Sequence, residues 1–358
     1  MKIAINGFGR IGRTTLKTII SPHDWGRIRL NKKFKRDAIE VVAINNLGGL
    51  DETSAYLFKH DSVYGTYPDQ VQLVKNGTHL RVGSREIPFY AEADPSNLPW
   101  GELDIDIVLE CTGAFTEFSK AEAHIKAGAK RVIISANGKG AGTSIVIGTD
   151  SYKDWKEQKE KPQVIANCSC TTNCAGPLMQ LLHSHYQILK AQLITVHAIT
   201  STQSLLDNKM KDLRGSRSAF ASIIPQSTGA AKAVERIIPD LKGKVSGSAF
   251  RVPVINGSVL EVVAQVSKET TAEEINNMLI NESENEYLGI IECYPDGLVS
   301  SDIIGLPIST IIDLPLTEVL DLPNVKDENL VKVVAWYDNE YAYTCRLVEL
   351  AQKVGETF

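Results

Sequence analysis

The chain has 358 residues and a formal net charge of −5, a length that suits two domains that each bury a core. Its acidic balance argues against a dedicated nucleic-acid-binding protein, and no apolar run approaches the length that spans a bilayer. The six cysteines lack the even spacing of small secreted domains and fit a reducing compartment. We therefore expect a soluble, cytoplasmic protein.

The first segment predicts a nucleotide site. Residues 2–6 form an apolar run typical of a buried strand, and residues 14–20 continue as a helix. Between them, Gly7, Gly9 and Gly12 have the Gly-x-Gly-x-x-Gly spacing. A strand before this spacing and a helix after it let the backbone approach a diphosphate at the helix N-terminus. The alternative is a glycine-rich turn that binds nothing.

The next predicted strand, residues 39–46, ends in Asn45 and Asn46, where the dinucleotide fingerprint expects an acidic residue. Asparagine can bind a ribose hydroxyl but does not repel a 2′-phosphate, so we expect NAD as cofactor with NADP also possible. The preceding segment 23–37 is basic. It is either a solvated excursion or a source of cations for a 2′-phosphate or a polyanion.

Residues 50–137 continue the pattern of alternating strands and helices. A helix is predicted at 54–62, and short strands follow up to residue 92. The apolar run 104–113 then predicts a strand, 119–129 a helix and 131–137 another strand. This alternation favours a doubly wound parallel sheet, which binds ligands at the carboxyl ends of its strands. Gly7, Thr112 and Ser135 all fall at such ends.

Three cysteines lie within seven positions, Cys168 and Cys170 at the end of the predicted strand 163–170 and Cys174 just after it. Small polar residues run here into an apolar segment, which predicts the start of a helix. A thiol in the first helical turn feels the positive end of the peptide dipoles, and this favours the thiolate. Cys170 is therefore the candidate nucleophile.

Other interpretations of the cysteines remain open. Metal ligation would need a second pair of ligands nearby, which the spacing lacks, so no metal is expected. A disulfide within the cluster is possible, but cysteines four apart on a helix favour reduced thiols. The isolated Cys111, Cys293 and Cys345 are expected to pack as small core residues.

The second half of the chain adds further polar candidates. A predicted strand, 192–203, carries His197 and Thr200, and a long loop over 207–233 follows it. Arg251 opens a region rich in predicted strands, and the chain ends in a strand, a turn with Asn339 and an amphipathic helix. We expect residues 1–168 and 335–358 to form the dinucleotide-binding domain, and 169–334 the catalytic domain.

The motifs NGFGRIGR, SCTTNC, TVHAIT, STGAAKA, FRVP and WYDNE occur in the order found in phosphorylating glyceraldehyde-3-phosphate dehydrogenases. The chain resembles that family nearly end to end. The resemblance implies a Rossmann-type NAD(P)-binding domain and an α+β catalytic domain with a mostly antiparallel sheet. It also implies that Cys170 is the nucleophile and His197 its base.

The resemblance assigns further roles by position. The cofactor diphosphate is implied at Arg10 and Ile11 beside the glycines, the adenine ribose at Asn46, and the nicotinamide half at Ser135 and Asn339. The substrate phosphate is implied at Thr200 and Arg251. The positions around the thiol and the inorganic phosphate are Ser169, Thr171, Thr228 and Gly229.

The implied activity is NAD(P)-dependent oxidation of D-glyceraldehyde 3-phosphate to 1,3-bisphosphoglycerate, through a thiohemiacetal and a thioester on cysteine. The partners are this substrate and inorganic phosphate, and the loop 200–225 implies a homotetramer. An erythrose-4-phosphate dehydrogenase would differ around TVHAIT and STGAAKA. A non-catalytic cofactor-binding or RNA-binding protein is the other alternative. Cys168 stands where alanine is common, and we expect a buried side chain there.

Overall fold

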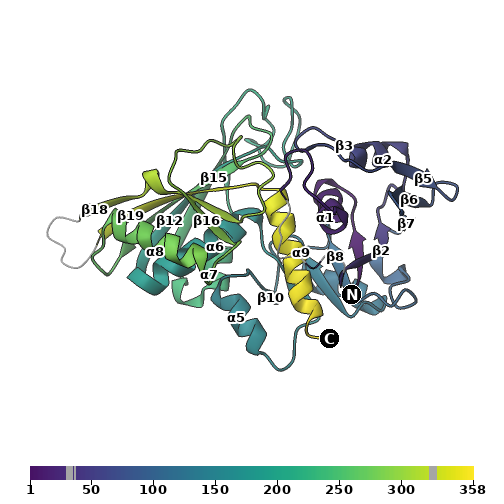
Figure 1. Cartoon of the computed structure of the whole chain (residues 1–358), viewed down its shortest axis with the longest axis horizontal. Coiled ribbons are helices and arrows are strands. Elements are labelled where there is room, and N and C mark those ends of the chain that lie inside the picture. Colours follow the sequence, from purple (N-terminus) through teal and green to yellow (C-terminus); the bar gives the residue numbers. More distant parts are fainter. Residues whose placement is uncertain (30–34, 36–37, 322–328) are drawn as a thin grey trace. The chain divides into compact units, whose positions relative to one another are not determined.

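The computed structural model describes residues 1–29, 35, 38–321 and 329–358 of the chain, which divide into two compact units. Unit 1 comprises residues 1–145, 158–168 and 344–358, and unit 2 comprises residues 146–157 and 169–343. Figure 1 labels many of their elements.

Unit 1 is built on a nine-stranded sheet of order β10-β11-β9-β8-β1-β2-β7-β6-β5. Its pairs from β10 to β7 are parallel, whereas β5, β6 and β7 are joined antiparallel. The predicted doubly wound sheet is thus confirmed. The strands are β1 (Lys2–Asn6), β2 (Glu40–Asn45), β5 (Val71–Val74), β6 (His79–Val82), β7 (Arg85–Tyr90), β8 (Ile107–Glu110), β9 (Arg131–Ile134), β10 (Thr143–Ser144) and β11 (Val164–Ala166), with a separate small pair, β3 (His60–Asp61) and β4 (Gly65–Thr66).

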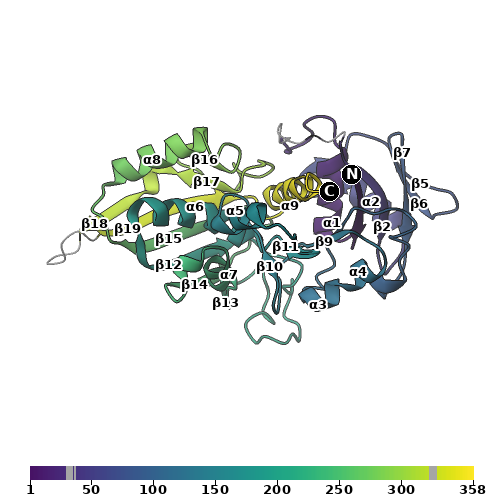
Figure 2. The same ribbon diagram turned by 90° about the horizontal axis from the view of Figure 1, so that it is seen from below.

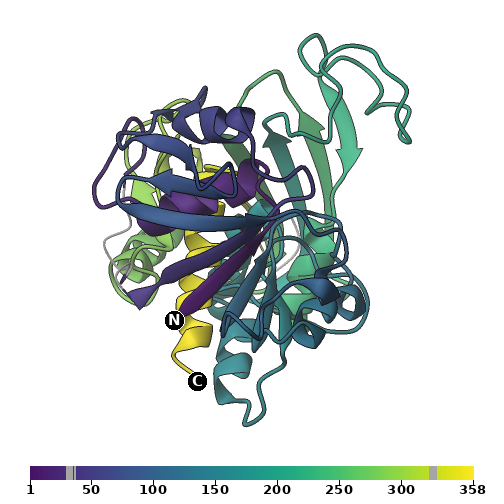
Figure 3. The same ribbon diagram turned by 90° about the vertical axis from the view of Figure 1, so that its right-hand side faces the viewer.

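The helices of unit 1 follow the strands that the sequence predicted. The view in Figure 3 shows α1 beside the sheet that begins at the N-terminus. The predicted helix 119–129 is instead two short helices that meet at Glu122, which is both the C-cap of α3 and the N-cap of α4. The helices are α1 (Arg10–Ile20), α2 (Glu52–Lys59), α3 (Phe118–Ala121), α4 (Ala123–Lys126) and most of α9 (Tyr341–Gly355).

The segment 23–37 is only partly described, and residues 30–34 and 36–37 lie outside the described residues. Most residues of its described beginning, 23–29, are exposed, and two are not. Trp25 and Ile28 are buried and form a β-bridge. The Trp25 ring packs edge-on against the Tyr67 ring. Two basic residues of the segment, Arg27 and Arg29, are exposed.

Unit 2 is built on a mostly antiparallel sheet of order β13-β14-β12-β15-β19-β17-β16, with β18 paired to β19. Only the pairs β12 with β14 and β16 with β17 are parallel among the described strands. The strands are β12 (Ile188–His197), β13 (Ile224–Ser227), β14 (Val245–Arg251), β15 (Ser258–Val266), β16 (Ile291–Tyr294), β17 (Thr310–Asp313), β18 (Glu318–Asp321) and β19 (Asn329–Tyr337).

Helices α6 (Cys170–Tyr186), α7 (Ala230–Ile237) and α8 (Ala272–Glu284) lie along this sheet (Figure 1). α6 spans 17 residues and buries the apolar run that the sequence placed after Cys170. The long loop between β12 and β13 extends away from the strands of its own unit in both Figures 2 and 3. No helix in the described ranges is long and apolar enough to cross a membrane.

The unit boundaries differ from the predicted ones in two places. Residues 146–157 belong to unit 2, since the backbone NH of Asp150 donates to Gln180 and α5 (Asp150–Glu157) contacts α7. The returning segment was predicted to start at residue 335, which lies within β19. β19 pairs along its full length with β15 and so belongs to the second sheet. The return to unit 1 begins at Thr344.

Candidate active site

Cys170 is the first residue of α6, as the sequence predicted, and Ser169 caps that helix. The Ser169 hydroxyl accepts a hydrogen bond from the Thr172 backbone NH at 3.2 Å. Because the cap has an extended backbone, φ −97° and ψ 166°, the chain turns sharply from β11 into the helix. The half-buried Cys170 thiol thereby lies in the first helical turn, where the backbone NH groups are free of helical partners.

His197 is the last residue of β12, and its Nε2 lies 3.5 Å from the Cys170 Sγ. The imidazole is 3% exposed, and its Nδ1 lies 2.7 Å from the carbonyl oxygen of Ala198. When Nδ1 donates to that carbonyl, Nε2 keeps a lone pair directed at the thiol. This tautomer is the one a general base needs.

Arg251 ends β14 and completes a three-residue cluster with Cys170 and His197. Its Nη1 contacts His197 Nδ1 and donates to the Ala198 carbonyl at 3.0 Å, while its Nε donates to Gln226 Oε1 at 3.2 Å. The hydrogen bonds to Ala198 and Gln226 fix the guanidinium plane beside the imidazole. A partly buried cation with remaining donors suits an anionic substrate group.

The electrostatics of this cluster favour the neutral forms of His197 and Cys170. Burial, reinforced by the Arg251 charge, lowers the pKa of His197 from 6.5 to about 3. Burial raises the pKa of the Cys170 thiol, and the Arg251 charge only partly offsets this. Burial of the sulfur thus opposes the thiolate that the start of α6 is expected to favour, and a neutral imidazole adds no positive charge beside it.

The Thr171 side chain points into the interior of unit 2. Its Oγ1 lies 2.9 Å from the Tyr337 hydroxyl, which lies 2.9 Å from Thr195 Oγ1, and Thr195 donates to the Val259 carbonyl. Since Thr195 uses its hydrogen on that carbonyl, the chain of hydroxyls runs from Thr171 through Tyr337 to Thr195. The first turn of α6 is thus tied to β12.

The remaining predicted positions of unit 2 lie on loops that leave the same sheet. Thr200 hydrogen-bonds Thr202 and, through its backbone NH, Gln203. Thr228 accepts from the Ala230 NH, and Gly229 is the N-cap of α7. Neither threonine has a recorded contact with Cys170 within the described chain.

The glycine-rich turn of unit 1 fits a dinucleotide diphosphate. Gly7 has φ +99°, and a Cβ there would lie 2.8 Å from the Thr112 nitrogen. A Cβ on Gly12 would lie 1.9 Å from the Gly7 oxygen, so the fold itself requires both glycines. A Cβ on Gly9, the N-cap of α1, would meet no atom within 4 Å. The open face at Gly9 is the side from which a diphosphate would approach the helix N-terminus.

Two family models match the chain, one within unit 1 and one within unit 2. Residues 1–118 match the family model "Glyceraldehyde 3-phosphate dehydrogenase, NAD binding domain", and residues 169–339 match the corresponding C-terminal domain model. Glyceraldehyde-3-phosphate dehydrogenase of Geobacillus stearothermophilus is 44% identical over 99% of this chain and 98% of its own. The enzymes of Chlamydia pneumoniae and Kluyveromyces lactis are 42% and 40% identical, over 99% of this chain and 98% and 100% of theirs.

The chain belongs to the glyceraldehyde 3-phosphate dehydrogenase family. The resemblance stated from its motifs is confirmed, and with it the fold class and an NAD-dependent oxidoreductase activity on an aldehyde.

The other cofactor positions predicted for this family member lie around the carboxyl ends of the parallel strands. The Asn46 amide accepts from the Phe8 NH and donates to the Gly49 carbonyl. Arg10 donates to Asp61 at 2.8 Å, which draws its guanidinium toward the protein. Ile11 lies in the first turn of α1. Ser135 directly follows β9, and its backbone NH donates to the Glu110 carbonyl. The Thr112 backbone NH donates to the Glu110 carboxylate.

A buried hydrogen-bond network that the sequence did not reveal lies behind that edge. The Glu110 carboxylate accepts from Asn6 and lies 3.1 Å from His124 Nε2. The Trp100 indole donates to His124 Nδ1 at 3.0 Å, which leaves the proton of the neutral imidazole on Nε2. His124 is thus a hydrogen-bonded structural histidine. The proximity of Trp100 to His124 is non-local, so no spacing in the sequence could have revealed it.

Cys168 is buried, as expected, and its backbone has the left-handed φ of +57°. None of the six cysteines forms a disulfide, and Cys174, four residues after Cys170 on α6, is fully buried.

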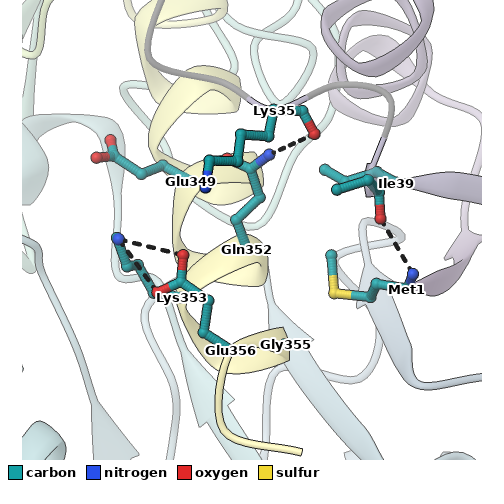
Figure 4. A pocket seen from close by; sticks show the side chains of 9 residues that line it. Met1, Lys35, Ile39, Glu349, Gln352, Lys353, Gly355 and Glu356 are labelled. Carbon is teal, nitrogen blue, oxygen red and sulfur yellow. Dashed lines mark hydrogen bonds and ion pairs between the residues drawn. The ribbon is translucent and has the colours of Figure 1, made fainter.

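Volume alone does not locate this site. A cavity of about 620 Å³ lies in unit 1 between Met1, residues 35, 38 and 39, and the last turns of α9 (Figure 4). There Gln352 donates to the Lys35 carbonyl and Lys353 pairs with Glu356. None of the predicted catalytic or cofactor positions lines this cavity.

Proposed function

We propose that this family member oxidises D-glyceraldehyde 3-phosphate and phosphorylates the product to 1,3-bisphosphoglycerate, with Cys170 as nucleophile and His197 as base. The observation that carries this proposal is the 3.5 Å contact between Cys170 Sγ and His197 Nε2, beside the Arg251 guanidinium. A thiol, a neutral imidazole and a fixed cation are the groups that an aldehyde bearing a phosphate requires.

The steps follow from these side chains. The Cys170 sulfur bonds to the aldehyde carbon as its proton leaves for the carbonyl oxygen, giving a thiohemiacetal. His197 Nε2 then takes the hydroxyl proton while the carbon loses hydride, and a thioester remains on Cys170. The bound nicotinamide supplies the hydride acceptor. An oxygen of inorganic phosphate attacks the thioester carbon, and the sulfur leaves to give the acyl phosphate.

The substrate phosphate is assigned to Arg251 and Thr200, and the inorganic phosphate to Ser169, Thr171, Thr228 and Gly229. Support comes from the free donors of the Arg251 guanidinium and from the start of α6, where backbone NH groups favour an anion. The Thr171 hydroxyl is committed to Tyr337, so its backbone NH is the more available donor there.

The test of this proposal is Cys170→Ser, assayed for NADH formation from glyceraldehyde 3-phosphate and phosphate. The matched control is Cys293→Ser, which removes another half-buried thiol of unit 2. Loss of turnover in the first variant alone is expected, and unchanged turnover in it would overturn the assignment. Comparing kcat/KM with erythrose 4-phosphate tests the alternative substrate.

The diphosphate is assigned to the turn at Gly7, Gly9 and Gly12 with Arg10 and Ile11, and the nicotinamide half to Ser135 and Asn339. We further propose that NAD is the main cofactor and that NADP binds measurably. Support comes from Asn46, whose amide carries no charge to repel a 2′-phosphate and keeps one amide hydrogen beyond its bond to Gly49. Calorimetric titration of the apo protein with each cofactor tests this, with Asn46→Asp expected to lower NADP affinity selectively. NADP binding too weak to detect would contradict it.

The assembly is proposed to be a homotetramer in a reducing, cytoplasmic compartment. Support for oligomers comes from large apolar side chains exposed on the loop between β12 and β13, among them Leu206 at 76% and Leu213 at 87%. Six free thiols support the reducing compartment. Sedimentation that shows only monomer at micromolar concentration would contradict the tetramer.

A further inference from the structure

Asn339 lies two residues after β19, and its side-chain amide is held by a second buried residue. Ser258, the first residue of β15, is the register partner of Tyr337 at the end of β19. Its hydroxyl donates to Asn339 Oδ1 at 2.9 Å. Ser258 and Asn339 are 1% and 5% exposed, so water does not compete for this hydrogen bond.

The same hydroxyl also accepts a hydrogen bond from the Ala198 backbone NH at 3.1 Å. Ala198 directly follows His197, and its carbonyl is the acceptor for His197 and Arg251. With a lone pair used by that NH, the single hydrogen of Ser258 has Asn339 Oδ1 as its acceptor. A flipped Asn339 amide would present hydrogens instead and leave the buried Ser258 hydrogen without that acceptor.

The direction of this bond decides what Asn339 offers to a ligand. With Oδ1 directed at Ser258, the amide presents its Nδ2 hydrogens on the other side. Asn339 Nδ2 has no recorded protein partner within residues 1–29, 35, 38–321 and 329–358. The residue is thereby set as a hydrogen-bond donor.

We propose that Ser258 is a positioning residue that fixes the Asn339 amide as a donor to the carbonyl oxygen of the nicotinamide carboxamide. This inference rests on the proposed function, which assigns Asn339 to the nicotinamide half of the cofactor. Ser258 does not touch the cofactor itself. It acts through Asn339, and it joins the amide that orients the cofactor to the backbone beside the base His197.

The backbone around Asn339 is held independently of Ser258. Asp338 accepts from Asn256 at 2.9 Å and caps α9 by accepting from the Glu340 and Tyr341 NH groups. Its second oxygen accepts from the Gly305 NH. Removing the Ser258 hydroxyl therefore frees the Asn339 amide to rotate while the turn that carries it stays in place.

The test compares NAD with its 3-acetylpyridine analogue, which keeps the carbonyl oxygen of the carboxamide and lacks its amino group. A donor amide binds both, whereas an amide that flips to acceptor loses the analogue and keeps NAD. In Ser258→Ala we expect the ratio of the analogue KM to the NAD KM to rise roughly tenfold over the wild-type ratio, the equivalent of one hydrogen bond. An unchanged ratio overturns the proposal.

Ser283→Ala is the matched control, because Ser283 is also a buried serine of unit 2 and donates to the Ile280 carbonyl. We expect it to leave the ratio unchanged. A loss of folding in Ser258→Ala is answered by Asn339→Asp, whose carboxylate still accepts from Ser258 but offers no NH donor. That variant raises the ratio if Asn339 is a donor, and it keeps the NAD KM unchanged if Asn339 is an acceptor, which overturns the proposal.

Asn339→Ala separates this inference from the proposed function. If it changes neither KM, the assignment of Asn339 to the nicotinamide half is wrong. If it raises both KM values while Ser258→Ala leaves the ratio unchanged, that assignment stands and only the role of Ser258 is wrong.

Discussion

His197 and Arg251 are register partners at the carboxyl ends of two parallel strands, β12 and β14. This alignment places the imidazole and the guanidinium side by side without any loop between them. The cation opposes protonation of the imidazole, and together with burial it lowers the pKa of His197 to about 3. It also has a benefit for Cys170, the proposed nucleophile, because the same charge lowers the pKa of its thiol against the effect of burial.

Arg251→Gln is expected to slow alkylation of Cys170 by iodoacetamide at neutral pH. The amide keeps much of the side-chain volume but removes the positive charge that favours the thiolate. Loss of a charge-assisted contact to the substrate phosphate is expected to lower kcat/KM about 10- to 100-fold. Arg236→Gln, an exposed change on α7, is the control. Alkylation at the wild-type rate in Arg251→Gln would contradict the electrostatic role.

Two glycines of the nucleotide turn are expected to respond differently to alanine. Gly9→Ala places its Cβ in open space at φ −71°, so the variant should unfold at the wild-type temperature but bind NAD about tenfold or more weakly. Gly12→Ala drives its Cβ against the Gly7 oxygen and should cost about 1–3 kcal/mol or more of stability. Calorimetric titration and thermal unfolding of both variants make the comparison. Equal NAD affinity in Gly9→Ala and the wild type would remove the diphosphate from this turn.

The local part of the site could be predicted from the sequence, because it depends on neighbours in the chain. Small polar residues before an apolar run indicated the start of α6, and Ser169 is the N-cap there. The same rule could have revealed α8, whose capping box pairs Thr271 with Glu274 in a region assigned only strands. That signal was present and was overlooked.

The non-local part could not be predicted from spacing. Nothing in the sequence relates Ser258 to Asn339, which are 81 residues apart, because their contact depends on the register of β15 against β19. Cys168 illustrates a different limit. Its left-handed backbone follows from the connection between β11 and the cap of α6, and a non-glycine residue is seldom expected in that conformation.

Tyr337→Phe is expected to lower the stability of unit 2 by about 1–3 kcal/mol, because the Thr171 hydroxyl would lose its acceptor and Thr195 a donor in a buried site. The ring itself is kept, so its packing against His197 remains. Urea unfolding followed by fluorescence measures the change. Tyr56→Phe, at an exposed position on α2, is the control. A wild-type midpoint in Tyr337→Phe would show that the hydroxyl chain adds no stability.

Lys17 gives unit 1 a stability that depends on pH. Its side chain is 2% exposed, its Nζ lies 3.2 Å from Asp61 Oδ2, and it lies over the rings of Trp25 and Phe58. Burial lowers its pKa from 10.5 to about 8, although Asp61 acts in the opposite direction. Between these two pH values the unfolded chain binds the proton that the folded chain has lost. Stability from this residue therefore rises with pH from about 8 to 10.5, by at most about 3 kcal/mol.

Lys17→Met removes this titration while keeping a long apolar side chain over the two rings. We expect the unfolding midpoint of the wild type to increase relative to that of the variant as the pH rises from about 8 to 10.5. Lys59→Met is the control, because Lys59 on α2 binds backbone carbonyls and not Asp61. Urea unfolding at several pH values across this range measures the difference. If the midpoint of the wild type falls relative to Lys17→Met across the range, the folded pKa of Lys17 is raised instead, and the Asp61 contact outweighs burial.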